Sequence, residues 1–101
     1  MPKAFSDTSQ DIVVRTGEVF TIELASNPTT GYQWELDLDP TRVKLLGNEH
    51  RRMGAGIGAG GIQVFTMQPL ETGSTSIRAA YKRAWEKEPI ERREFRLHVT
   101  A

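Results

Sequence analysis

The sequence predicts an all-β fold, namely an immunoglobulin-like antiparallel β-sandwich of about seven strands. Three observations support this prediction. Several runs alternate between apolar and polar residues, which is the pattern of a strand with one buried face. Turn signals, among them Asp39-Pro40-Thr41 and Gln68-Pro69, separate these runs. No stretch of the chain repeats its apolar residues with the helical period of about 3.6.

The alternation is clearest in two runs of the first half of the chain. Phe20, Ile22 and Leu24 share one face of a strand whose other face is polar. Tyr32 and Trp34 begin a second run of the same kind. By this criterion we expect strands at Asp11–Arg15, Glu18–Ala25, Tyr32–Leu38, Val43–Glu49, Ile62–Met67, Thr75–Lys82 and Phe95–Val99.

Length and composition limit what the protein can do. We expect a monomer with a single domain over residues 1–101 and a flexible N-terminal tail over residues 1–10. The absence of cysteine excludes disulfides, thiolate nucleophiles and Cys-based metal sites. The 13 basic and 13 acidic residues balance, so neither nucleic acid nor an anionic membrane is an expected partner.

The sequence leaves the compartment open. No apolar run approaches the length of a membrane span. The first seven residues lack the apolar core of a signal peptide. This pattern fits a cytoplasmic protein, and it fits equally a periplasmic or secreted protein whose leader has been removed.

The connector Asn27–Tyr32 combines residues that fix a backbone shape. The Asn27 side chain can accept a hydrogen bond from the N–H two residues on, as in an Asx-turn. Pro28 fixes its own φ at about −65°, and Gly31 can take a positive φ that lets the chain reverse. We interpret the connector as a rigid wedge with two threonines at its tip. The plain alternative is a tight turn that only joins two strands.

Three chemically unusual connectors are predicted to share one end of the sandwich. Strand direction alternates in an antiparallel sandwich, so every second connector falls at the same end. The connector 27–32, the glycine-rich run Met53–Gly61 and the segment Arg83–Pro89 are related in this way. Loops presented by a rigid sandwich are common sites of recognition.

Two of these connectors have compositions suited to binding. Trp85, two residues after Arg83, is typical of an interface hot spot, whereas the alternative is that Trp85 folds back and caps the sandwich. The glycine-rich run lets a partner approach its backbone closely, whereas the alternative is an ordinary surface hairpin.

Motifs for catalysis or cofactor binding are weak. Residues 56–61 match G-x-G-x-x-G, but a strand follows them instead of a helix, so no dinucleotide site is predicted. His50 and His98 have no partners at the spacing of a metal site or a catalytic motif. The carboxylates between residues 86 and 91 are interpreted as a solvated charge run. We therefore predict no enzyme activity, no cofactor and no metal site.

Three segments, in this order, resemble the loop motifs of the chagasin-like inhibitors of papain-like cysteine peptidases. Asn27-Pro28-Thr29-Thr30-Gly31-Tyr32 matches N-P-T-T-G-[YF], Gly58-Ala59-Gly60-Gly61 matches G-x-G-G, and Arg83-Ala84-Trp85 matches R-P-[WF] except at its second residue. We call them the first, second and third loop motifs. The resemblance spans nearly the whole chain and implies a sandwich that inhibits papain-family peptidases reversibly.

The resemblance also implies a role for each motif. The 27–32 loop enters the active-site cleft of the peptidase. Thr29 and Thr30 lie at the centre of this loop. The 54–61 and 82–89 loops flank it on either side. The second loop motif lies along the cleft wall through its main chain.

The third loop motif is implied to pack on the peptidase surface through Arg83 and Trp85. Ala84 replaces the proline of the family pattern, which removes a restriction on the free loop. The alternative to inhibition is a non-inhibitory adhesion or ligand-binding module that uses the same loop end.

Overall fold

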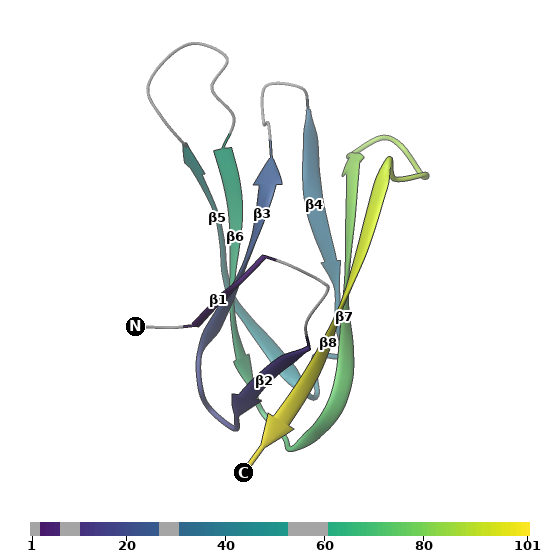
Figure 1. Cartoon of the computed structure of the whole chain (residues 1–101). Helices are drawn as coiled ribbons and strands as arrows, with labels where there is room; N and C mark the ends of the chain where they lie inside the picture. Colours follow the sequence, from purple (N-terminus) through teal and green to yellow (C-terminus); the bar gives the residue numbers. More distant parts are fainter. Residues whose placement is uncertain (1–2, 7–10, 27–30, 53–60) are drawn as a thin grey trace.

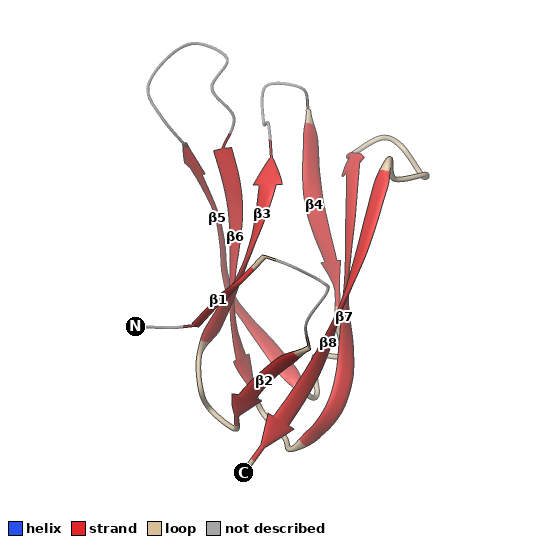
Figure 2. Cartoon of the chain, in the orientation of Figure 1, coloured by secondary structure: helices blue, strands red, loops and turns tan. Residues whose placement is uncertain are grey.

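In the part of the chain that the structure describes, residues 3–6, 11–26, 31–52 and 61–101, eight strands form two sheets that pack face to face (Figure 1). The structure is a computed structural model. The strands are β1 (Lys3–Phe5), β2 (Ile12–Arg15), β3 (Phe20–Ser26), β4 (Tyr32–Asp37), β5 (Val43–Arg52), β6 (Gly61–Pro69), β7 (Gly73–Arg83) and β8 (Glu91–Thr100). These described residues contain no helix (Figure 2), so the predicted all-β, immunoglobulin-like sandwich is confirmed.

The strand order is β1-β3-β6-β5 in one sheet, which we call sheet A, and β2-β8-β7-β4 in the other, sheet B. Antiparallel pairing joins β3 to β6, β5 to β6, β4 to β7 and β7 to β8. However, β1 pairs in parallel with β3, and β2 in parallel with β8. The sandwich is therefore not wholly antiparallel as predicted, because the N-terminal segment adds one short parallel strand to each sheet before the antiparallel strands begin.

The expected N-terminal tail over residues 1–10 contains the strand β1. Three residues are too few to show alternation, so no pattern in the sequence indicates this strand. Phe5 packs edge-on against Phe20, with ring centroids 6.1 Å apart, and this contact anchors the segment to sheet A. Residues 1–2 and 7–10 lie outside the described part of the chain.

Several strands run further than the alternation indicates. β5 continues to Arg52, which pairs with Gly61, and β8 already begins at Glu91, which pairs with Tyr81. The added residues are mostly charged, so they carry no apolar alternation and are recognised only by their pairing. A shift of register at Leu46 also interrupts β5 at the edge of sheet A.

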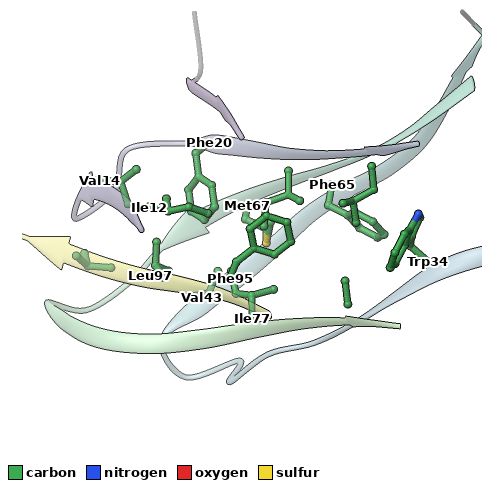
Figure 3. Close-up of a cluster of buried hydrophobic side chains, with 14 residues drawn as sticks. Ile12, Val14, Phe20, Trp34, Val43, Phe65, Met67, Ile77, Phe95 and Leu97 are labelled. Carbon is green, nitrogen blue, oxygen red and sulfur yellow. The ribbon is translucent and has the colours of Figure 1, made fainter. Parts of the chain in front are cut away.

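The two sheets enclose one cluster of buried side chains (Figure 3). Phe20, Phe65 and Phe95 are its largest members, and each is at most 2% exposed. Ile22 and Leu24 are buried beside Phe20, as the alternation predicts. Burial of apolar surface contributes roughly 25 cal/mol per Å², so this cluster is the main source of the stability that holds the connectors in place.

A buried glutamine joins the two sheets near one end of this cluster. Gln63 of β6 is fully buried. Its Oε1 accepts a hydrogen bond from the Trp34 N–H of β4 at 2.8 Å, and its Nε2 donates to the Trp34 carbonyl at 3.0 Å. Gln63 Nε2 also donates to Asn48 Oδ1 at 3.1 Å. Because β4 is the last strand of sheet B, the Gln63 side chain takes the place of a neighbouring strand for Trp34.

Gln63→Leu is expected to destabilise the protein by about 2–4 kcal/mol, because both backbone groups of Trp34 lose a buried partner. Urea unfolding followed by circular dichroism measures this change. The matched control is Gln33→Leu, on the exposed face of β4, which we expect to change stability by less than about 0.5 kcal/mol. Equal midpoints for the wild type and Gln63→Leu would show that the Gln63 hydrogen bonds contribute nothing.

Candidate functional site

The strand ends that flank the three unusual connectors lie at one end of the sandwich (Figure 1). In sheet A, Gly61 pairs with both Ser26 and Arg52. In sheet B, Tyr32 pairs with Arg83. The indole Nε1 of Trp34 donates to the Ala25 carbonyl at 2.9 Å and links the two sheets just below this end. The clustering of these ends agrees with the prediction from strand direction.

The structure describes part of each predicted motif. Tyr32 begins β4, Gly61 begins β6 and Arg83 ends β7, so each motif is attached to a strand of the sandwich. Ala84 and Trp85 follow in the connector to β8. The remaining predicted site residues, Asn27, Pro28, Thr29, Thr30, Gly58, Ala59 and Gly60, lie outside the described residues.

Gly31 brings the first and third loop motifs into contact. It has a φ of +82°, as expected for the residue that reverses the chain into β4. A Cβ atom built on Gly31 would lie 3.4 Å from Trp85 Cη2 and 4.0 Å from Arg83 Cγ. Fifty residues of the chain separate the two motifs, yet the tip of the indole lies beside Gly31 of the first.

A stack of rings connects this contact to the core. The guanidinium of Arg83 lies over the Tyr32 ring, 4.5 Å from its centroid. Tyr32 stacks on Tyr81 at 5.4 Å, and Tyr81 packs against Trp34 at 4.8 Å. Trp34 is only 3% exposed and belongs to the buried cluster. The stack therefore leads without interruption from the core to the Arg83 guanidinium at the loop end.

The connector 84–90 is shaped by hydrogen bonds at the end of β7. The Glu86 N–H donates to the Arg83 carbonyl at 3.0 Å, which closes a turn over residues 83–86. Lys82 Nζ donates to the Glu86 carbonyl at 3.1 Å, and the same ammonium lies 3.4 Å from Glu35 Oε2. The Ile90 N–H donates to the Tyr81 carbonyl at 2.9 Å, where the chain re-enters sheet B.

Trp85 points outward at this turn. Its side chain is 74% exposed, although tryptophan usually buries most of its surface. The exposed ring does not support the alternative that Trp85 folds back and caps the sandwich. Its edge lies beside Gly31, while most of the ring remains available to a partner.

The described residues were compared with the requirements of a metal site and of a catalytic site. They contain no group of three or more side chains that could hold a metal ion. At the opposite end of sheet B, Ser74 Oγ lies 2.8 Å from His98 Nδ1, and His98 Nε2 lies 2.7 Å from Asp11 Oδ2. No local pattern in the sequence indicates these linked side chains, because Asp11 and His98 are 87 residues apart. These side chains are exposed and tie Asp11, just before β2, to β8, so we assign them a structural role.

The described residues include no helix long and apolar enough to cross a bilayer. Two pairs of opposite charge lie near the loop end: besides the Lys82–Glu35 pair, Arg83 Nε lies 3.9 Å from Glu86 Oε1. The loop end therefore combines an exposed aromatic ring with largely compensated charges.

Loops that a rigid sandwich presents together at one end are common sites of recognition. Residues 13–99 match the chagasin family peptidase inhibitor I42. The chain belongs to this family, which is one of inhibitors and not of enzymes. The resemblance inferred from the loop motifs is thus confirmed.

The chain is similar in sequence to one relative and in fold to two solved structures. The chain is 32% identical over 79 residues to Amoebiasin-2 of Entamoeba histolytica, and the alignment covers 72% of this chain and 63% of that protein. It therefore spans less than two thirds of that relative's length. The crystal structure of the cysteine protease inhibitor EhICP2 from Entamoeba histolytica is similar, with a TM-score of 0.80 and 23% identity over 97% of this chain and 95% of that one. The solution structure of amebosin has a TM-score of 0.67 and 23% identity over 99% of both chains.

Ala84→Pro is expected to stabilise the protein by about 0.4–1 kcal/mol. Ala84 is the second residue of the turn 83–86, where proline is favoured. Its restriction of the free loop should also improve binding of a partner by up to about fivefold. Urea unfolding and a dissociation constant measure the two effects. Ala84→Gly is the opposing variant and should weaken both, whereas weaker binding by Ala84→Pro would show that proline distorts the turn.

Proposed function

We propose that the chain is a reversible inhibitor of papain-like cysteine peptidases. In this proposal the 27–32 loop enters the active-site cleft, and the 54–61 and 82–89 loops flank it. The observation that carries the proposal is the exposed Trp85 ring lying against Gly31, at the end where all three motifs are attached to the sandwich. Membership of a peptidase inhibitor family supports it.

The proposed mechanism requires no bond to be made or broken by the inhibitor. The loop end offers an exposed ring and backbone held by the sandwich, and the strand ends beneath it are joined by hydrogen bonds. A rigid binding surface loses little conformational entropy when it binds. Occlusion of the peptidase nucleophile by a preformed surface explains inhibition by shape alone, and a single domain acting as a monomer is sufficient for it.

Titration of active papain with the purified protein is expected to abolish peptidase activity at micromolar inhibitor or below. Activity towards a fluorogenic peptide measures the loss, and its recovery on dilution demonstrates reversibility. The inhibitor recovered from the complex should be intact on electrophoresis. Full papain activity at micromolar concentrations of the folded protein would contradict the proposal and favour a non-inhibitory binding module.

Trp85→Ala is expected to weaken binding to papain by about 2 kcal/mol or more, which is roughly 30-fold in the dissociation constant. The ring is already exposed, so its removal should change the stability of the free protein only slightly. Leu70→Ala is the matched control, because Leu70 is an exposed apolar residue in the turn between β6 and β7, at the other end of the sandwich. An unchanged dissociation constant for Trp85→Ala would show that Trp85 is not a binding hot spot.

A further inference from the structure

We infer that Arg83 is a positioning residue, whose guanidinium holds Tyr32 of the first loop motif and Trp85 of the third in one fixed arrangement before a peptidase binds. This inference rests on the proposed inhibition. It assigns to Arg83 a role different from the contact with the peptidase surface that the loop motif implies. Arg83 would act on binding through Tyr32 and Trp85.

The guanidinium of Arg83 lies near an aromatic ring of each of these two motifs. It is 4.5 Å from the ring centroid of Tyr32, the last residue of the first loop motif. It is 5.8 Å from the ring centroid of Trp85, in the third. The stem of the same side chain lies beside Gly31, since a Cβ at Gly31 would meet Arg83 Cγ at 4.0 Å. One side chain thus lies next to Tyr32 and Gly31 of the first motif and near Trp85 of the third.

Contacts on the side of the sandwich core also fix Arg83. Tyr32 and Arg83 are directly opposite each other in the β4–β7 pairing, at the last position of that pairing. The Tyr32 ring rests on Tyr81, which packs on the buried Trp34. The Arg83 carbonyl accepts the hydrogen bond that closes the turn carrying Trp85. The side chain and the backbone of this residue therefore both connect the frame to the loops.

The chemistry of arginine suits this position. A planar guanidinium can stack on aromatic faces while its edge donors remain available, which an ammonium group cannot do. Its positive charge is attracted to the faces of the rings, and this attraction increases where water is partly excluded. The Arg83 side chain is 39% exposed and its Nε atom is buried, so the group is partly shielded from solvent.

The contribution of Arg83 to the free energy of binding distinguishes a positioning role from a direct contact with the peptidase. If Arg83 acts by holding the two loops, its contribution to inhibition must depend on the Tyr32 ring. If Arg83 instead contacts the peptidase independently, its contribution must be the same with or without that ring. A double-mutant cycle separates the two cases, because independent effects add and coupled effects do not.

The experiment measures dissociation constants for papain with wild type, Arg83→Met, Tyr32→Leu and the double variant. We expect Arg83→Met to weaken binding about three- to tenfold in the wild-type background. In the Tyr32→Leu background the same change should cost less than about twofold. The matched control is Arg78→Met, on the same strand, whose guanidinium pairs with Glu94 away from the loops; it should leave binding unchanged. An equal cost of Arg83→Met in both backgrounds overturns the inference.

A measurement on the free protein tests the same point without a peptidase. Acrylamide quenching of tryptophan fluorescence should increase in Arg83→Met, because Trp85 loses a neighbour, and should not change in Arg78→Met. Arg83→Lys retains the charge without the planar group and serves if Arg83→Met does not fold. We expect Arg83→Lys to bind more weakly than wild type, and wild-type affinity would overturn the inference. Failure of the wild type to inhibit papain would instead contradict the proposed function, so the two failures are distinguishable.

Discussion

The hydrogen bonds between Gln63 and the backbone of Trp34 are the constraint on which the loop end depends. β4 is the last strand of sheet B and has a partner, β7, on one side only. On its other side, the N–H and carbonyl of Trp34 are paired with the buried Gln63 of sheet A. This pairing fixes the start of β4, and hence the exit of the first loop, relative to β6, where the glycine-rich connector ends.

The ring stack carries this constraint outward to the recognition surface. Trp34, held by Gln63, supports Tyr81 and through it Tyr32, and the Arg83 guanidinium covers Tyr32. Trp85 then lies at the outer end of the series, mostly exposed. Trp34 belongs to the buried cluster, and the members beyond it are more exposed than a core residue. A series of side-chain contacts thereby links the buried interior to the exposed Trp85 ring.

Local patterns predicted the strands and the clustering of the loops, but not the contacts that hold the loops. Alternation identified the buried faces around Phe20 and Trp34, and the need for a reversal identified the positive φ of Gly31, observed at +82°. Gln63 looked like an ordinary polar residue, because its partner is 29 positions away. The pairing of Tyr32 with Arg83 likewise required the register between β4 and β7. Parallel pairing of the two short N-terminal strands has no local signature at all.

The third loop motif departs from the family pattern at Ala84, where the pattern has proline. Ala84 lacks the restriction that proline would impose on the free loop. The turn is nevertheless closed by the hydrogen bond from the Glu86 N–H to Arg83, and Lys82 binds the Glu86 carbonyl. These two hydrogen bonds restrict the conformation of the turn, as proline would in part. It follows that the arrangement of Trp85 depends more on β7 and its side chains than on the residue at position 84.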